Sequence, residues 1–232
     1  MSDQSKGEAR NQILSGIRTA LKRGPATDAQ RGAAAERVRT HPRNLVPARA
    51  QLDHEEQVAL FVRMALEVSC TVERIPDLAA VPQAVAEYLA GLNLPAELRV
   101  APDPELSAIP WAERPTLTVT AGRARDADAV SLTGAFAAVA ETGTLMLVSG
   151  AERPTTLNFL PDTHIVVLRR DQIVGGYEDA WDRLRAVQAS FEGGMPRTVN
   201  LITGPSRTGD IEQTIQLGAH GPRRLHVLLV GE

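Results

Sequence analysis

The first stretch whose residue types could carry chemistry is Ala140–Thr144, with the sequence Ala-Glu-Thr-Gly-Thr. Gly143 permits the positive φ that a tight reversal often needs, and Thr142 and Thr144 place two hydroxyls beside exposed backbone amides. Such a turn can hold a phosphate or a carboxylate, and Glu141 at its edge could act as a base, a nucleophile or an anchor. The same residues also fit a helix that ends at glycine and carries a solvated glutamate. Both interpretations stay open.

A second polar turn, Thr203–Glu212, directly follows a predicted strand. In open α/β sheets ligands bind at the carboxyl ends of strands, and the amides of such a turn favour an anion. Arg207 could bind a carboxylate or phosphate through two parallel hydrogen bonds. Asp210 is a candidate catalytic residue, but it could instead cap a helix that begins at Ile211. The candidate ligand-binding residues of this turn are Gly204, Ser206, Arg207 and Thr208.

A third turn, Gly218–Pro222, contains His220 and Gly221 just before the last predicted strand. A histidine between Ala and Gly in a turn is well placed to be accessible, so His220 is a third candidate catalytic residue, beside Glu141 and Asp210. The alternative is a turn residue that bonds its own backbone. The other histidines lie in a linker, a helix start or strands: His41, His54, His164 and His226.

Several kinds of site are excluded or disfavoured. Cys70 is the only cysteine, so this chain can neither form an internal disulfide nor supply the thiolates of an iron–sulfur cluster. Its apolar, β-prone surroundings predict a buried structural residue. No pair of histidines has metal-ligand spacing, so we expect no metal site and no cofactor in this chain. The Gly-Lys-Ser/Thr ending of a P-loop and the dinucleotide-binding glycine pattern are both missing.

Helical and strand patterns alternate along most of the chain. This alternation predicts an α/β fold with a largely parallel sheet flanked by helices. Asp53 and Glu56 have the spacing of a capping box before an apolar stripe. Further helices are predicted at Pro82–Gly91, at Gly134–Ala140 (capped by Thr133) and at 177–191. The predicted strands are 70–73, 98–101, 117–120, 130–132, 144–148, 164–168, 198–203 and 225–230.

The N-terminal region differs from the rest. Ile13, Leu14, Ile17 and Leu21 recur at helical spacing and predict an amphipathic helix that stops at Gly24-Pro25. The segment 24–47 lacks sustained periodicity and indicates a linker or a loosely ordered arm. We therefore expect an N-terminal helix and linker over residues 1–47 and an α/β domain over residues 48–232.

Charge and hydropathy limit the partners. The net charge is −3 and the pI is about 6.0, which gives no electrostatic reason to expect nucleic-acid or anionic-membrane binding. No apolar run approaches the roughly 18 residues of a spanning helix, and the polar N-terminus lacks an apolar core of signal-peptide length. We expect a cytoplasmic protein.

In their order, the motifs resemble the LUD (lactate-utilization) domain family. They are Ala138–Thr144, Pro161-x-x-His164, Gly204–Glu212 and Leu217–Pro222, and the start Ile13–Arg18 is similar to that of the protein C subfamily. Gly209 departs from the alanine that is frequent in the family. The matching positions are Glu141, Thr142, Gly143, Thr144, Gly204, Pro205, Ser206, Asp210, His220 and Gly221.

The resemblance implies a fold similar to that of sugar-phosphate isomerases, formyltetrahydrofolate cyclo-ligases and class I coenzyme-A transferases. It also implies a role in the oxidation of L-lactate to pyruvate, beside sister proteins that carry iron–sulfur clusters. Three hypotheses follow. The chain could be a component of the lactate system that binds a small anion or a partner. It could be a stand-alone transferase or isomerase that uses Glu141. It could also be a non-catalytic assembly or regulatory protein that docks through its N-terminal helix.

Overall fold

The computed structural model describes residues 3–208 and 216–231. Its contacts divide the chain into two compact units, Met1–Asn44 and Leu45–Glu232, and each unit is described by itself. The predicted helix start at Ile211, together with Asp210, lies outside the described residues.

The first unit contains two helices, α1 (Asp3–Ala20) and α2 (Asp28–Thr40). On α1 the side chains of Ile13 and Ile17 are exposed, and so is that of Leu21 just after the helix. Helix α2 lies within the segment that we predict to be a linker. It has no buried residue, and a reciprocal pair of hydrogen bonds between Thr27 and Gln30 caps its start. Apolar periodicity missed α2 because no face of this helix is apolar.

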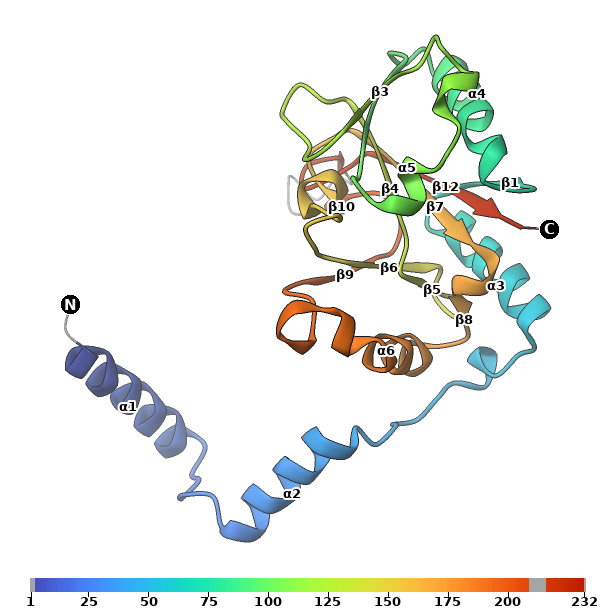
Figure 1. Cartoon of the computed structure of the whole chain (residues 1–232). Coiled ribbons are helices and arrows are strands. Elements are labelled where there is room, and N and C mark those ends of the chain that lie inside the picture. The colour runs from blue at the N-terminus through green and yellow to red at the C-terminus, as the bar shows by residue number, and fades with distance from the viewer. Residues whose placement is uncertain (1–2, 209–215, 232) are drawn as a thin grey trace. The chain divides into compact units, whose positions relative to one another are not determined.

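The second unit is built on a six-stranded sheet in which every neighbouring pair is parallel, in the order β1-β12-β7-β4-β2-β3 (Figure 1). This confirms the predicted α/β fold with a largely parallel sheet. The neighbouring inner strands β7 and β12 are apolar runs buried on both faces. The strands are β1 (Thr71–Ile75), β2 (Glu97–Val100), β3 (Thr118–Ala121), β4 (Val130–Gly134), β7 (Thr163–Arg169) and β12 (Arg224–Val230).

Different layers cover the two faces of this sheet. Helix α4 (Val81–Gly91), with Pro82 in its first turn, packs on one face. Helix α3 (His54–Glu67) packs on the other face, and the predicted capping box of Asp53 and Glu56 starts it. Side chains alternate between these layers along each strand, as the two-residue period of β structure requires. On β7, Ile165 and Val167 face the α4 layer, whereas Val166 and Leu168 face the α3 layer.

A second, four-stranded sheet shares the α3 face, in the order β8-β5-β6-β9. Its β5/β6 and β6/β9 pairs are antiparallel, and its β5/β8 pair is parallel. Helix α6 (Tyr177–Ala186) covers its outer side and ends earlier than predicted, before a short 3₁₀ turn. The strands are β5 (Ala137–Val139), β6 (Thr144–Val148), β8 (Ile173–Val174) and β9 (Val199–Ile202).

The predicted helix Gly134–Ala140 is wrong. These residues form the end of β4 and all of β5. Ala137 is fully buried on the α6 side of the second sheet, and Ala138 and Ala140 are fully buried on its α3 side, where small side chains fit between packed layers. Alanine favours helices in isolation, but packing in tertiary context overrides that preference here.

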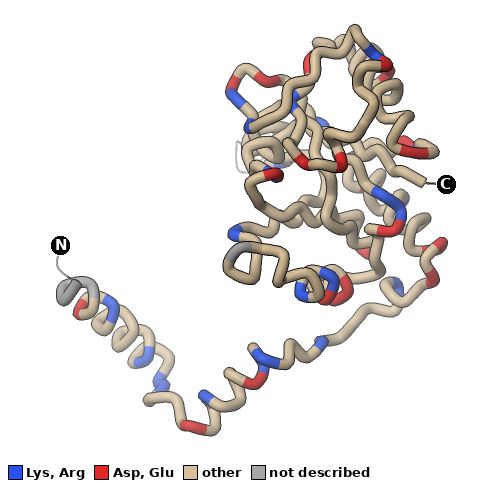
Figure 2. Tube along the Cα trace, viewed as in Figure 1, with Lys and Arg blue, Asp and Glu red and all other residues tan. Residues whose placement is uncertain are grey.

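Short elements complete the second unit. A small antiparallel ribbon pairs β10 (Arg207–Thr208) with β11 (Gln216–Leu217), and α5 (Pro104–Ser107) follows β2. Basic and acidic residues are interspersed along the chain, in agreement with its small net charge (Figure 2). Within the described ranges, none of the helices has the length and apolar character needed to cross a membrane.

Candidate functional site

The first predicted turn is packed tightly against α3. Gly143 has a φ of 65°, and a Cβ added there would lie 2.5 Å from the backbone nitrogen of Ala65. Only glycine fits this position, because a side chain would be strained by the backbone conformation and would also clash with the helix.

The hydroxyls of this turn form a closed network. Thr144 Oγ1 lies 2.7 Å from Thr142 Oγ1, 2.9 Å from the Tyr177 hydroxyl and 2.6 Å from Thr203 Oγ1. Thr142 Oγ1 also contacts the Tyr177 hydroxyl at 3.0 Å. The network ties β6 to the N-terminus of α6 and to the end of β9. These hydroxyls therefore bond to one another and hold the layers together.

Glu141 is buried, with its side chain only 7% exposed, and lies against the segment that enters the second unit. Its Oε2 is 3.8 Å from Nε of Arg49, and its amide donates to the carbonyl of Gly175 at 3.1 Å. A Cβ added at Gly176 would lie 3.4 Å from Glu141 Oε1, so glycine leaves room for the carboxylate. Of the three roles considered for Glu141, namely base, nucleophile and anchor, these contacts favour that of an anchor, which holds the turn to neighbouring segments.

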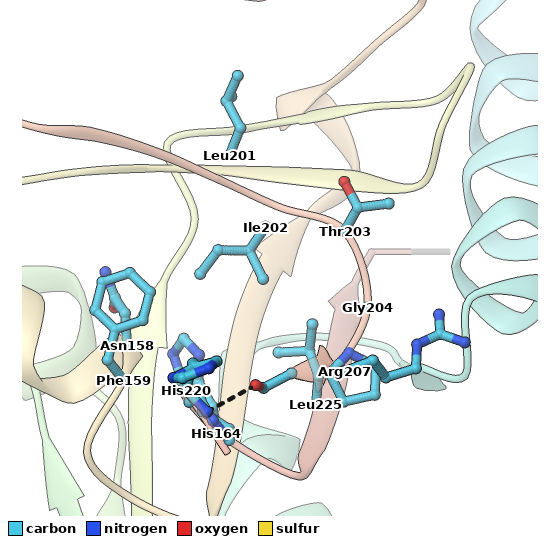
Figure 3. Close-up of a pocket in the computed structure, with 14 residues that line it drawn as sticks. Asn158, Phe159, His164, Leu201, Ile202, Thr203, Gly204, Arg207, His220 and Leu225 are labelled. Atoms are coloured by element: carbon cyan, nitrogen blue, oxygen red, sulfur yellow. Dashed lines mark hydrogen bonds between the residues drawn. The ribbon is translucent and has the colours of Figure 1, made fainter. Parts of the chain in front are cut away.

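The second and third turns line one pocket of about 260 Å³ (Figure 3). They contribute Gly204, Ser206, Arg207, His220 and Gly221, whereas Glu141, Thr142, Gly143 and Thr144 are not among the lining residues. The wall on the mixed-sheet side comes from β9 and the residue after it. The other lining residues are Asn158, Phe159, His164, Leu201, Ile202, Thr203, Pro205, Pro222 and Leu225.

Burial separates the floor of the pocket from its mouth. The buried lining residues form the floor, among them His164, Leu225 and Asn158 with exposures of 0%, 3% and 6%. Phe159 and Leu201 are more than two-fifths exposed and form an apolar rim. The remaining exposed lining residues, also at the mouth, are Thr203, Arg207 and His220.

The pocket lies beside the amino ends of β7 and β12, where His164 and Leu225 stand near the starts of their strands. This differs from the expected position at the carboxyl ends of the parallel sheet. The reason is that the second turn follows β9, which belongs to the mixed sheet. Thr208 is buried and pairs with Gln216 in the small ribbon.

Hydrogen bonds within the protein already occupy several polar groups of the two turns. The Ser206 amide donates to the carbonyl of Pro222 at 2.8 Å, and the His220 amide donates to Ser206 Oγ at 3.3 Å (Figure 3). Gly204 has a φ of 78°, and a Cβ there would lie 2.5 Å from the carbonyl oxygen of Val68. The two turns therefore brace each other as well as lining the pocket.

The guanidinium of Arg207 is directed toward the end of α3, away from the two histidines (Figure 3). Its Nη2 donates to the carbonyl of Val68 at 2.9 Å. Beside it, burial raises the pKa of the Cys70 thiol to about 11, although the Gly204 amide and Arg207 both act to lower it. Cys70 is 4% exposed, as the sequence predicts, and at neutral pH it is a thiol and not a nucleophilic thiolate.

His164 is the polar group of the floor that our sequence interpretation assigned only to a buried strand. Its Nε2 lies 2.8 Å from Thr133 Oγ1 on the neighbouring strand β4. Its Nδ1 is buried and has no hydrogen-bond partner among the residues that the structure describes. Burial lowers the pKa of His164 to about 3, so the ring is neutral at pH 7. The motif Pro161-x-x-His164 was a sequence signal for this position, because it places a histidine where a turn enters an apolar run.

No group of three or more metal-ligating side chains converges in the portions of the chain that the structure covers. The polar groups that the pocket offers are thus two imidazoles, hydroxyls and an amide, with apolar walls. Such a lining can bind a small molecule that carries both oxygen atoms and apolar surface.

Comparison with known proteins identifies the domain. The LUD domain model matches residues 116–230. Lactate utilization protein C of Deinococcus radiodurans is 45% identical over 106 residues, which are 45% of this chain and 47% of that protein. Lactate utilization protein C of Bacillus subtilis is 33% identical over 103 residues, which are 44% of this chain and 42% of that protein. The matched stretch therefore spans less than half the length of these relatives.

A solved structure shares the fold. A crystal structure described as a DUF162 family protein from Deinococcus radiodurans superposes with a TM-score of 0.58 at 28% sequence identity, and the match covers 78% of this chain and 99% of that one. The domain match contains β4 to β12 and every residue that lines the pocket. On these grounds residues 116–230 of this chain, which include the whole pocket lining, belong to the LUD-domain family.

Proposed function

We propose that this chain is a component of an L-lactate utilization system and that it binds a small organic acid in the pocket between β7 and β9. Lactate utilization is the process that appears in the names of its relatives. The observation that carries the ligand-binding part is the unpartnered Nδ1 of His164 in the floor of a pocket that the LUD domain builds. A buried polar atom without a hydrogen-bond partner is uncommon in folded proteins, and a bound ligand that bonds to it would meet this unused capacity.

The size and lining of the pocket favour a small acid over a larger ligand. A volume of about 260 Å³ lies just below the range of about 300–1,000 Å³ that is usual for drug-sized molecules. His220 at the mouth can meet a carboxylate, while Ile202 and Leu225 can contact a short carbon chain.

The electron-transfer chemistry of lactate oxidation must then belong to other proteins. This chain has one cysteine, whose buried thiol cannot hold a cluster by itself. We propose that iron–sulfur sister proteins carry the redox centres and that this chain works beside them in the cytoplasm. The proposed point of association is formed by three exposed apolar side chains, those of Ile13 and Ile17 on α1 and of Leu21 just after it.

A thermal-shift titration tests the ligand-binding part. The probes are pyruvate, L-lactate, coenzyme A and a sugar phosphate. A ligand at about 100 times its Kd should stabilise the protein by about 2.7 kcal/mol, which such a titration detects readily. Pyruvate or L-lactate should raise the Tm. If only coenzyme A or the sugar phosphate does so, the small-acid proposal is wrong.

A matched pair of variants localises the binding. Leu201 at the mouth and Leu92 at the end of α4 are exposed to 42% and 41%, but only Leu201 lines the pocket. Leu201→Asp places a negative charge beside the bound acid and should weaken its binding several-fold, because like charges repel. Leu92→Asp should leave binding unchanged. Equal effects of the two substitutions would place the ligand elsewhere.

Growth tests the assignment to lactate utilization. A strain in which the gene is deleted, and which has no second copy, should fail to grow on L-lactate as sole carbon source but grow on pyruvate. Undiminished growth on L-lactate contradicts the proposed process. A chain that lacks residues 1–24 should fail to restore growth if α1 is the point of association.

A further inference from the structure

The floor of the pocket has one polar atom whose bonding the protein leaves incomplete, Nδ1 of His164. The ring is fully buried, and its other nitrogen is held by Thr133 at 2.8 Å. What Nδ1 offers to a ligand depends on which nitrogen carries the proton, because a neutral imidazole has one donor and one acceptor.

The contact with Thr133 favours one of the two tautomers. If the Thr133 hydroxyl donates to Nε2, the proton lies on Nδ1, and a single donor is left without a partner. If Nε2–H donates to Thr133, then Nδ1 is an unused acceptor and the Thr133 hydroxyl proton has no acceptor in the described structure either. Unpaired buried donors are unfavourable, so the first arrangement, with one unmet group, has the lower free energy. His164, whose side chain lines the floor of the pocket, therefore carries a buried Nδ1–H donor without a partner in the described structure.

The surroundings of this donor decide which oxygen it can meet. The floor also contains Leu225 and the amide of Asn158, and no charged side chain among the described residues lines it. An ionised carboxylate placed there would lose its hydration without gaining a cation, which is strongly unfavourable. The mouth is different, because its exposed lining, which includes the imidazole of His220, leaves a carboxylate in contact with water. A neutral oxygen fits the floor, and a carboxylate fits the mouth.

We propose that the pocket takes a small 2-oxo or 2-hydroxy acid, whose carbonyl or hydroxyl oxygen accepts a hydrogen bond from His164 Nδ1–H while its carboxylate lies at the mouth. This inference rests on the proposed function and adds the class of the ligand and the residue that selects it. His164 acts here as a specificity-determining residue. It rejects an acid that has no oxygen at the second carbon, because the buried donor then stays unpaired.

The tautomer can be measured on the ligand-free full chain. Nitrogen NMR of a sample labelled with ¹⁵N-histidine distinguishes Nδ1–H from Nε2–H, and the His164→Asn variant identifies the signal by its loss. We expect a neutral ring protonated at Nδ1 at pH 7, and in the Thr133→Val variant we expect a mixture of the two tautomers. A ring protonated at Nε2 in the wild type would overturn the donor assignment, whatever the ligand is.

Ligand selection is tested with pyruvate and propionate, two acids of equal chain length that differ in the oxygen at the second carbon. Wild type should bind pyruvate about tenfold more tightly than propionate, because one buried hydrogen bond distinguishes the two acids. His164→Leu should lose this preference but still bind both acids, which also shows that the variant is folded. His164→Asn should keep part of the preference, since its Nδ2–H₂ can take the place of Nδ1–H.

The outcomes separate the two proposals. If the wild type binds neither acid, both the ligand of the proposed function and this inference fail. If it binds both acids with equal affinity, the small-acid function stands and the role of His164 fails. A preference that persists unchanged in His164→Leu also overturns the role of His164.

Discussion

Two glycine turns of similar composition meet where Thr144 contacts Thr203, but they use their polar groups in different ways. The turn Glu141–Thr144 has its hydroxyls bonded to one another and its carboxylate beside Arg49. The turn after β9 lines a pocket in which His164 Nδ1 has no described partner. Both turns have the residue types of an anion site. The difference teaches that turns with the same residue types can use their polar groups either for bonds within the protein or to line a pocket.

The substitution Gly143→Ala should have the largest effect on this comparison. The positive φ and the contact with the Ala65 backbone together should lower the free energy of unfolding by roughly 3 kcal/mol. Urea denaturation measures this effect. Gly134→Ala is the control, since a Cβ there meets nothing within 4 Å and the change should be close to neutral. Equal stabilities of the two variants would show that the first turn is not tightly packed.

The second-largest expected effect is a loss of stability in acid, caused by two buried histidines. Burial lowers the pKa of His164 to about 3 and that of His226 to about 4, from 6.5. Below pH 6.5 the unfolded chain binds protons that the folded chain does not bind, so stability is complete above pH 6.5 and falls as the pH decreases toward 4. Each histidine should contribute about 1.4 kcal/mol per pH unit in this window.

Urea denaturation at pH 7, 6 and 5 measures this slope, and His164→Asn should reduce it by about half because one of the two groups is gone. A slope that this variant leaves unchanged would mean that His164 is charged or exposed in the folded protein. That result would also remove the neutral donor from the floor of the pocket.

Removal of one hydroxyl tests whether the first turn is a joint. Thr144 is fully buried and contacts the hydroxyls of Thr142, Tyr177 and Thr203. Thr144→Val keeps the shape but leaves these groups short of a partner, and it should destabilise the protein by about 2 kcal/mol. The exposed Thr120 on β3 offers the matched Thr→Val control, for which we expect no measurable change. A similarly small effect at Thr144 would contradict the closed network.

Glu141→Gln should have the smallest effect. Its contact with the exposed Arg49 is long, at 3.8 Å, so the change should cost about 1 kcal/mol or less. Because Glu141 does not line the pocket, affinity for pyruvate should stay within about twofold of wild type in the thermal-shift titration. Loss of binding or of growth on L-lactate would indicate that Glu141 acts as a base or nucleophile. The first turn would then be functional as well as structural.

Local signals predicted much of the fold. Helix α3 has a capping box at Asp53 and an apolar stripe behind it, and the strands β7 and β12 are unbroken apolar runs. The helix prediction for Gly134–Ala140 was wrong because alanines are compatible with both helix and strand, and contacts with residues distant in sequence decide between the two. The prediction of a linker at helix α2 was wrong for a different reason. Its caps and composition make a helix, but it has no apolar face for a pattern to reveal.

The candidate site was less accessible to sequence reasoning. The turn residues Ser206 and His220 stood out by type, and both line the pocket. The distinctive property of His164 depends on Thr133, which lies 31 positions earlier, and on the burial that Leu225 provides. Similarly, the environment of Glu141 depends on Arg49, which is far away in sequence. Hydrogen-bond satisfaction is a property of the assembled layers and cannot be counted along one segment.

The position of β12 has a consequence for how this protein is made. This strand, the last of the described elements, lies between β1 and β7 and forms parallel ladders with both. During synthesis the earlier strands leave the ribosome with a gap at this place in the sheet, and β7 exposes an apolar edge until residues 224–230 emerge. Parallel strands that are distant in sequence pair slowly. Folding of the α/β unit is therefore expected to finish only after translation has passed its last strand.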